Sequence, residues 1–182
     1  FFALNQVDLK YPFFDIPTSE NAITGICVGL AIDGYKPVLN HQRLDFALLS
    51  LDQIINNAAK IHYMFGGELT CPIVIRMIIG RGWGQGPTHS QNLQQIFAGI
   101  PGLNVVIPST PQDAYSLMRA SINCKDPIIF LEHRWLHNSY GKVNFVYSED
   151  DLKEQKVIGN GKDFAILACS YMVPEAIRAK TL

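Results

Sequence analysis

The stretch GRGWGQGPTHSQ (Gly80 to Gln91) decides the fold of this chain because of what stands on either side of it. Before it comes CPIVIRMII (Cys71 to Ile79), an apolar run rich in β-branched residues that predicts a strand buried on both faces. After it, apolar residues recur at helical spacing between 93 and 100. A loop with four glycines that leaves a buried strand is where an α/β protein binds a ligand, although a merely tight turn is the alternative.

The alternation of strand and helix continues on both sides of this glycine loop, which we define as residues 80–91. Buried apolar runs and helical periods follow each other with short connections, which is typical of a mostly parallel sheet. The expected elements are a strand at 36–40, a helix from Asp45 to about Met64, a strand in PGLNVVIP (101–108), a helix from Pro111 to about Asn123 and a strand in DPIIFLEH (126–133). Asp45 is a candidate cap for its helix.

The predicted fold class is therefore α/β, an open and mostly parallel sheet with helices on both faces. We expect one domain over residues 1–137 and a polar linker over 138–162, with a short strand near Val143 to Tyr147. Residues 163–182 read as the start of a second α/β domain, beginning with a strand and a helix. Both ends look cut, so we expect a piece of a longer chain.

Composition limits the class of partner. The 182 residues are 48% hydrophobic and 17% charged, as in a globular protein, and the net charge of −1 argues against a nucleic acid or an anionic membrane held by electrostatics. The longest apolar stretches are strand-sized, so no membrane span is expected. The five histidines show no metal-ligand spacing, and no metal site is predicted within this chain.

The cysteines indicate a reducing compartment. None has the CxxC spacing, and most stand in apolar runs, so we expect buried free thiols and a cytoplasmic location. Disulfides or a zinc site are the alternatives. The residues are Cys27, Cys71, Cys124 and Cys169.

Glu20 is conspicuous because it begins a helix that is rich in small and apolar residues. Thr18 and Ser19 precede it and offer hydroxyls for the helix N-cap. The functional interpretation of Glu20 is a buried carboxylate with a raised pKa that shares a proton with a ligand nitrogen. The alternative is that the carboxylate only complements the helix dipole.

Polar residues also follow the predicted strand at 36–40. His41, Gln42 and Arg43 stand where an open sheet binds its ligands, and Phe46 comes just after them. Phe46 alone would be interpreted as a core residue. His89 lies in the glycine loop, and we expect it to meet Glu20 and Phe46 at one edge of the sheet.

Six stretches give the chain a family resemblance: FDIPTSENAITGICVG, SLDQIINNAAKIHYMFGG, CPIVIR, THSQ, PGLNVVIPSTPQDA and DPIIFLEH. In their order and spacing they resemble the beta subunit of thiamine-diphosphate-dependent 2-oxo acid dehydrogenases, in particular of the pyruvate dehydrogenase type. From about Phe13 to His133 the resemblance covers a transketolase-like pyrimidine-binding domain. Asp163 to Leu182 resembles the opening of the C-terminal domain of that family.

The resemblance implies roles for three residues. Glu20 matches the glutamate that bonds a ring nitrogen of the cofactor's aminopyrimidine and so promotes formation of the reactive ylide. Phe46 matches the aromatic residue that packs on the pyrimidine. His89 matches the histidine that exchanges protons with the substrate-derived intermediate. Gln42 is expected among the cofactor-binding residues.

The resemblance also implies partners. No GDG segment, which holds the magnesium and the diphosphate, occurs here, so an alpha subunit is expected to supply that half within an assembly of two alpha and two beta chains. The expected reaction decarboxylates a pyruvate-like 2-oxo acid and passes the acyl group to a lipoyl acyltransferase. A structural potassium ion is a further expectation, bound by backbone carbonyls of Ser121, Ile122, Cys124 and Asp126.

Two departures from the pyruvate-type pattern concern Arg43 and Arg81, which favour a larger or anionic substrate, or else subunit contacts. A transketolase-like ketol-transfer enzyme is the nearer alternative function, and a noncatalytic scaffold with the same fold is the other. A nucleotide-binding domain is excluded because neither GxGxxG nor the P-loop pattern is present.

Overall fold

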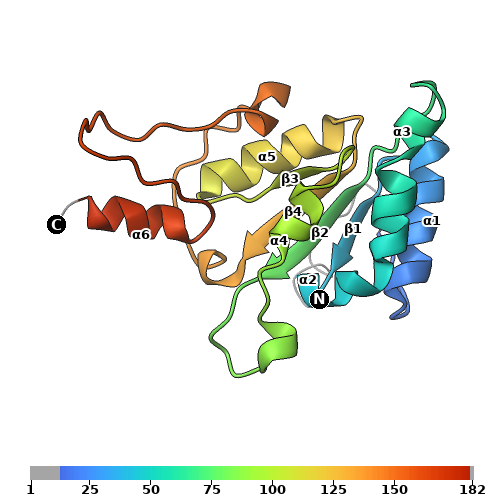
Figure 1. The fold of residues 1–182 in the computed structure, drawn as a ribbon, viewed down its shortest axis with the longest axis horizontal. Helices are drawn as coiled ribbons and strands as arrows, with labels where there is room; N and C mark the ends of the chain where they lie inside the picture. The colour runs from blue at the N-terminus through green and yellow to red at the C-terminus, as the bar shows by residue number, and fades with distance from the viewer. Residues whose placement is uncertain (1–12, 181–182) are drawn as a thin grey trace.

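The computed structural model describes residues 13–180, and a sheet of four parallel strands forms its centre (Figure 1). The strands lie in the order β1-β2-β4-β3. Their bounds are β1 Val38–His41, β2 Val74–Ile79, β3 Asn104–Val106 and β4 Ile128–His133. The prediction of an open parallel sheet is confirmed, with each strand within a few residues of its expected place.

The two central strands are apolar on both faces. Ile75, Met77 and Leu131 belong to one core, whereas Val74 and Phe130 belong to the other. All five side chains are at most 2% exposed. A strand that is covered on both sides needs a continuous apolar run instead of alternation, and CPIVIRMII supplies one.

Helices cover both faces of the sheet, as expected. Their bounds are α1 Glu20–Ile32, α2 Leu44–Ala47, α3 Ile61–Met64, α4 Gln94–Ala98, α5 Pro111–Asn123 and α6 Met172–Ala179. Figure 1 shows α1 and α5 on opposite sides of the sheet. On the face of α5, Leu117, Met118 and Ile122 pack against the core of Val106 and Phe130.

The predicted helix from Asp45 to Met64 is interrupted. It begins at Leu44 as α2 and continues as the 3₁₀ turn η2 (Leu48–Ser50) and the π-helical η3 (Gln53–Ala58) before α3. The hydrogen bond from the Ala59 N–H to the Ile54 oxygen spans five residues, which is the pattern that widens a helix into a π turn.

The starts of α5 and α1 differ. Thr110 and Asp113 form the reciprocal capping box of α5, each side chain accepting the other's backbone N–H at 3.1 Å. Pro111 follows at the first helical position, as predicted. At α1 the expected side-chain cap is wrong, because the Ser19 hydroxyl accepts no capping bond. The backbone angle ψ of Ser19 is 84°, whereas that of Thr110, which is extended, is 163°.

The segment after β4 is mostly irregular. It contains two 3₁₀ turns, η5 (Arg134–Leu136) and η6 (Glu149–Leu152), and the helix α6. The predicted strands at 143–147 and after Asp163 do not form, because no neighbouring strand in residues 13–180 pairs with either. The helix predicted within residues 163–182 is present as α6. The division of the chain into a domain, a linker and a second domain remains a prediction.

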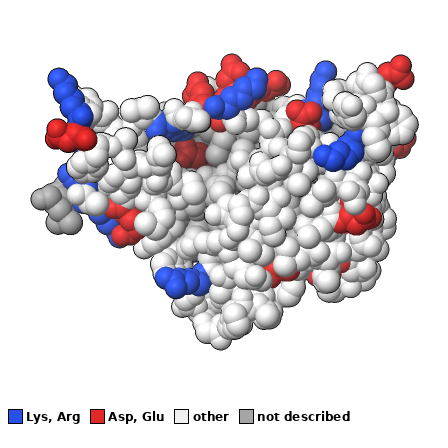
Figure 2. All heavy atoms as spheres, viewed as in Figure 1, with Lys and Arg blue, Asp and Glu red and all other residues white. Residues whose placement is uncertain are grey.

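The surface carries mixed charge. In the face shown in Figure 2, basic and acidic side chains are interspersed near the margins, and the middle is largely uncharged. None of the helices in the described part of the chain combines the length and the apolar character needed to cross a bilayer.

Candidate functional site

The carboxyl ends of β1 and β2 bring Phe46 and His89 into contact. Phe46 stands in α2, which begins just after β1, and His89 ends the 3₁₀ turn η4 (Pro87–His89) in the glycine loop after β2. The two rings meet edge to face, with centroids 5.3 Å apart and planes at 82°. Both residues are half-buried, so part of each side chain is open to solvent.

Glu20, the first residue of α1, is connected to the carboxyl end of β1 by Thr24 and His41. The Thr24 hydroxyl donates to the Glu20 backbone oxygen at 2.7 Å and lies 3.1 Å from the His41 Nε2. Burial lowers the pKa of His41, and the nearby Glu20 carboxylate opposes that shift. Because Thr24 contacts both the Glu20 backbone and His41, the first turn of α1 lies beside the end of β1. Glu20 itself is half-buried, more open than the buried carboxylate that the sequence suggests.

The structure therefore joins Phe46 to His89 directly and places Glu20 beside the end of β1. Gln42 follows β1 at the same edge, with an exposed side chain. The roles of these four residues toward a cofactor remain predictions.

Arg43 and Asp45 form a buried pair that the sequence did not suggest. The Arg43 Nε lies 3.3 Å from the Asp45 Oδ2, and the side chains are 7% and 3% exposed. Asp45 was expected to cap the helix, but the helix starts at Leu44, and the Asp45 Oδ1 instead accepts the side-chain and backbone N–H groups of Gln91. Arg43 donates to the Gly80 oxygen at 3.2 Å, so it is occupied inside the chain. Arg81 is exposed, and its predicted substrate contact stays a prediction.

His133 supports the start of the glycine loop from the other side. It ends β4 and is 9% exposed. Gly80 has φ 107°, and a Cβ there would lie 2.7 Å from the His133 Nε2. The His133 ring also packs on Trp135 and Tyr171, with centroids 5.5 and 5.2 Å away. The sequence could have indicated His133, because it is the last residue of an apolar strand, as His41 is.

Comparison with known proteins identifies the family of this chain. The family description "transketolase, pyrimidine binding domain" matches residues 1–138. The chain belongs to this family. Its curated relatives include the beta subunit of acetoin:2,6-dichlorophenolindophenol oxidoreductase from Cupriavidus necator, 40% identical over 91% of this chain and 49% of the relative.

Two further relatives of the pyrimidine-binding chain are beta subunits of pyruvate dehydrogenase E1 components. The chloroplastic beta-2 subunit of Arabidopsis thaliana is 39% identical over 92% of this chain and 42% of its own length. The Staphylococcus aureus subunit is 37% identical over 91% and 51%. The chain thus spans about half the length of the curated relatives it matches.

A solved structure supports the fold. A split-gene transketolase, described as an inactive beta4 tetramer, superposes with a TM-score of 0.55 over 67% of this chain and 37% of its own. At 18% identity this likeness concerns the fold alone.

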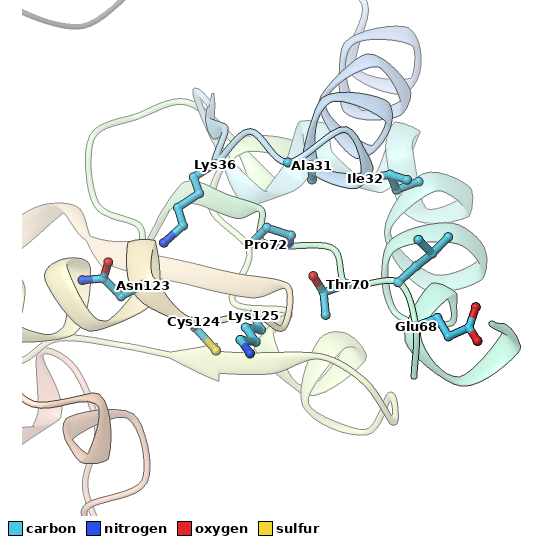
Figure 3. A pocket seen from close by; sticks show the side chains of 11 residues that line it. Ala31, Ile32, Lys36, Glu68, Thr70, Pro72, Asn123, Cys124 and Lys125 are labelled. Carbon is cyan, nitrogen blue, oxygen red and sulfur yellow. The ribbon is translucent and has the colours of Figure 1, made fainter. Parts of the chain in front are cut away.

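The pyrimidine-binding domain also has a hollow of about 350 Å³ away from these residues. Figure 3 shows side chains around it from the end of α1, from the segment before β2 and from the end of α5, among them Ala31, Pro72 and Asn123. These positions lie at the amino ends of the strands. Because the strands are parallel, Phe46 and His89 lie at the opposite edge of the sheet.

A second cleft, of about 340 Å³, lies at the carboxyl ends of β3 and β4 and is lined by Thr110, His133 and His137. Within residues 13–180 no three His, Cys, Asp or Glu side chains gather as a metal site.

The four cysteines are free, as predicted, but only Cys27 and Cys71 are buried. Cys124 is partly buried, and the expected burial of Cys169 is wrong because its segment stays irregular and open to solvent.

Proposed function

We propose that this chain forms part of the beta subunit of a thiamine-diphosphate-dependent 2-oxo acid dehydrogenase. The reaction is the oxidative decarboxylation of a pyruvate-like 2-oxo acid, with transfer of the acyl group to a lipoyl carrier. The observation that carries the proposal is one sheet edge where Glu20 begins α1 beside the end of β1 and the Phe46–His89 pair lies beside the end of β2. Relatives that are 37–40% identical and are named as beta subunits support it.

The side chains at this edge suit an aminopyrimidine ring. The ring is flat and carries nitrogens, and the edge offers one carboxylate, two aromatic rings and an exposed amide, that of Gln42. When bound, thiamine diphosphate supplies the carbon nucleophile for the 2-oxo acid and accepts the electron pair released with CO₂. Glu20 holds a proton at a ring nitrogen, and Phe46 packs on the ring face.

His89 is the proposed proton carrier for the substrate. Its Nδ1 lies 3.0 Å from the Thr88 hydroxyl, which can orient the ring and leave Nε2 to meet the substrate oxygen. The edge-on packing against Phe46 fixes the plane of the imidazole. A histidine that is held in one orientation within reach of the substrate can serve as a general acid or base.

The proposal includes partners. An alpha subunit supplies the groups for the diphosphate and its magnesium ion in an assembly of two alpha and two beta chains, and a lipoyl acyltransferase receives the acyl group. A potassium ion on the carbonyls of Ser121, Ile122, Cys124 and Asp126 is proposed on the family resemblance alone. A cytoplasmic location is supported by the four free cysteines.

The experiment titrates thiamine diphosphate with magnesium into the full-length beta chain, into the alpha chain and into the two combined, by calorimetry. We expect stoichiometric binding only in the mixture, followed by decarboxylation of one 2-oxo acid with an artificial electron acceptor. Tight binding by the beta chain alone would refute the shared site. Binding in the mixture together with ketol transfer and no turnover of 2-oxo acids would replace the proposal with the transketolase-like alternative, and no binding would favour the scaffold.

A further inference from the structure

We propose that Arg43 and Asp45 act as a buried clamp that positions the glycine loop, and through it His89, for the reaction. This inference rests on the proposed function for the role of His89, but the clamp itself is a property of the chain. The two residues flank Leu44, the first residue of α2, and Asp45 directly precedes Phe46. The side chain that holds the loop and the ring that receives His89 therefore belong to the same short helix.

The clamp holds both ends of the glycine loop. Arg43 Nη2 donates to the backbone oxygen of Gly80, the first loop residue, at 3.2 Å. Asp45 Oδ1 accepts from the Gln91 side chain at 2.8 Å and from the Gln91 backbone N–H at 3.3 Å. Gln91 is the last loop residue and stands two positions after His89. One ion pair thus connects the two ends of the loop.

The clamp also reaches the middle of the loop. Arg43 Nη1 donates to Gln85 Oε1 at 3.0 Å, and the same oxygen accepts the indole N–H of Trp83. The Arg43 guanidinium lies 5.0 Å from the centre of the Trp83 ring, within the range of a cation–π contact. Arg134, from the turn after β4, contacts the same ring at 5.3 Å. Three points of the loop therefore depend on Arg43.

The glycine content of the loop explains why it needs such a device. Four glycines in seven residues allow the loop many conformations. Holding the loop in one of them, with His89 in a fixed position, therefore costs conformational entropy. The planar fork of an arginine can bond an oxygen on each side at once, which a lysine cannot do. Burial of both charges keeps the pair out of competition with water. These features assign Arg43 and Asp45 a positioning role, without contact to the reacting atoms.

The test uses the full-length beta chain assembled with its alpha partner. Removing only Arg43 would leave the Asp45 charge buried and unpaired, so the informative variant is Arg43→Met combined with Asp45→Leu, which removes both charges and nearly keeps their shapes. The matched control is Arg76→Met combined with Glu132→Leu, which removes the ion pair between β2 and β4. Arg43→Lys keeps the charge and loses the fork.

The first readout is amide hydrogen exchange of the peptides that cover residues 80–91, which requires neither substrate nor activity. We expect the clamp variant to exchange at least about tenfold faster at these amides, including that of Gln91, while β3 stays unchanged. The control variant should leave the loop as it is. Unchanged protection of the loop in the clamp variant would overturn the proposal, even if the proposed reaction were also wrong.

The second readout separates positioning from general damage. In the clamp variant we expect the turnover number for decarboxylation to fall at least about tenfold, since small misplacements of a catalytic group are costly. Exchange of the thiazolium proton, which depends on Glu20, should stay within about twofold, and Arg43→Lys should recover part of the turnover. An equal loss of both rates, or no loss of turnover, would contradict the positioning role.

Discussion

The imidazole of His89 meets the ring of Phe46 edge to face, 5.3 Å between centroids, although the two residues come from different connections of the sheet. Phe46 follows β1 and His89 follows β2, and these strands are adjacent and parallel. Two connections that leave the same end of adjacent strands meet above that end. The pair is therefore a consequence of topology, and the roles of its members can be tested one at a time.

Glu20→Gln should slow exchange of the thiazolium proton of bound thiamine diphosphate by at least about a hundredfold, because an amide cannot hold the proton at the pyrimidine nitrogen as a carboxyl can. The fold should be intact, since the Thr24 hydroxyl bonds the backbone oxygen of residue 20 and not its side chain. Exchange is measured by NMR after a pulse in deuterated buffer, and circular dichroism reports the fold. Glu68→Gln, an exposed carboxylate before β2, is the control. Equal exchange in Glu20→Gln and wild type would remove Glu20 from the mechanism.

His89→Asn should give the opposite separation. The proposed role of His89 is toward the substrate, so we expect decarboxylation to fall about 10²- to 10⁴-fold, the usual range for loss of a general acid or base. Exchange of the thiazolium proton should stay near the wild-type rate. Single-turnover decarboxylation and proton exchange on the same preparation provide the comparison. A parallel loss of both rates would mean that His89 supports the cofactor and not the substrate.

The buried His41 predicts how stability depends on pH. Burial lowers the folded-state pKa of His41 below its usual value near 6.5, against the opposing charge of Glu20. Below about pH 6.5 the unfolded chain therefore binds more protons than the folded chain, and stability falls with falling pH until the folded-state pKa is passed. His133, whose pKa is also lowered by burial, acts in the same direction.

The midpoint of thermal unfolding should accordingly be lower at pH 5.5 than at pH 7.5. Each histidine contributes at most about 1.4 kcal/mol per pH unit within its window. His41→Gln should reduce the difference between the two midpoints, and His62→Gln, an exposed histidine in α3, should not. An unchanged difference in His41→Gln would show that this residue does not carry the effect.

Thiol reactivity should follow burial. Burial raises the pKa of Cys71 to about 11 and also raises that of Cys27, so few thiolates form and alkylating reagents cannot reach them. Cys169 is exposed. We expect N-ethylmaleimide at pH 7.5 to modify Cys169 first and to spare Cys71 and Cys27 until denaturant is added, as followed by peptide mass spectrometry. Early modification of Cys71 would contradict its burial in the core.

The fold was largely predictable from the sequence because its signals are local. CPIVIRMII and DPIIFLEH are continuous apolar runs, and the Thr110–Asp113 box is a spacing of three residues. The strand after Asp163 was not predictable in the same way. A strand forms only where another strand offers its backbone groups, and the apolar pattern of a segment carries no information on whether a neighbour is present.

The candidate site was predictable only in part. Glu20 was indicated by its place at the start of an apolar helix, Phe46 by its place just beyond a strand end and His89 by the glycine loop. The clamp was missed because Arg43 and Gln91 lie far apart in the sequence, and nothing local distinguishes an arginine that bonds a loop from one that meets a substrate. Asp45 was misjudged for a related reason, since a shift of one residue in the helix start changes a cap into a buried partner.

Gly80→Ala tests the start of the glycine loop. Gly80 has φ 107°, which side-chain-bearing residues rarely adopt, and the new Cβ would lie 2.7 Å from the His133 Nε2. We expect a loss of about 1–3 kcal/mol in the free energy of unfolding, measured with urea, from backbone strain and displacement of His133. Combining it with His133→Ala should relieve the steric part only, because the backbone strain remains.

Gly29→Ala in the interior of α1, where nothing lies within 4 Å of the new methyl group, should instead stabilise the protein by about 0.5–1 kcal/mol. Equal midpoints for the two alanine variants would contradict the contact between Gly80 and His133.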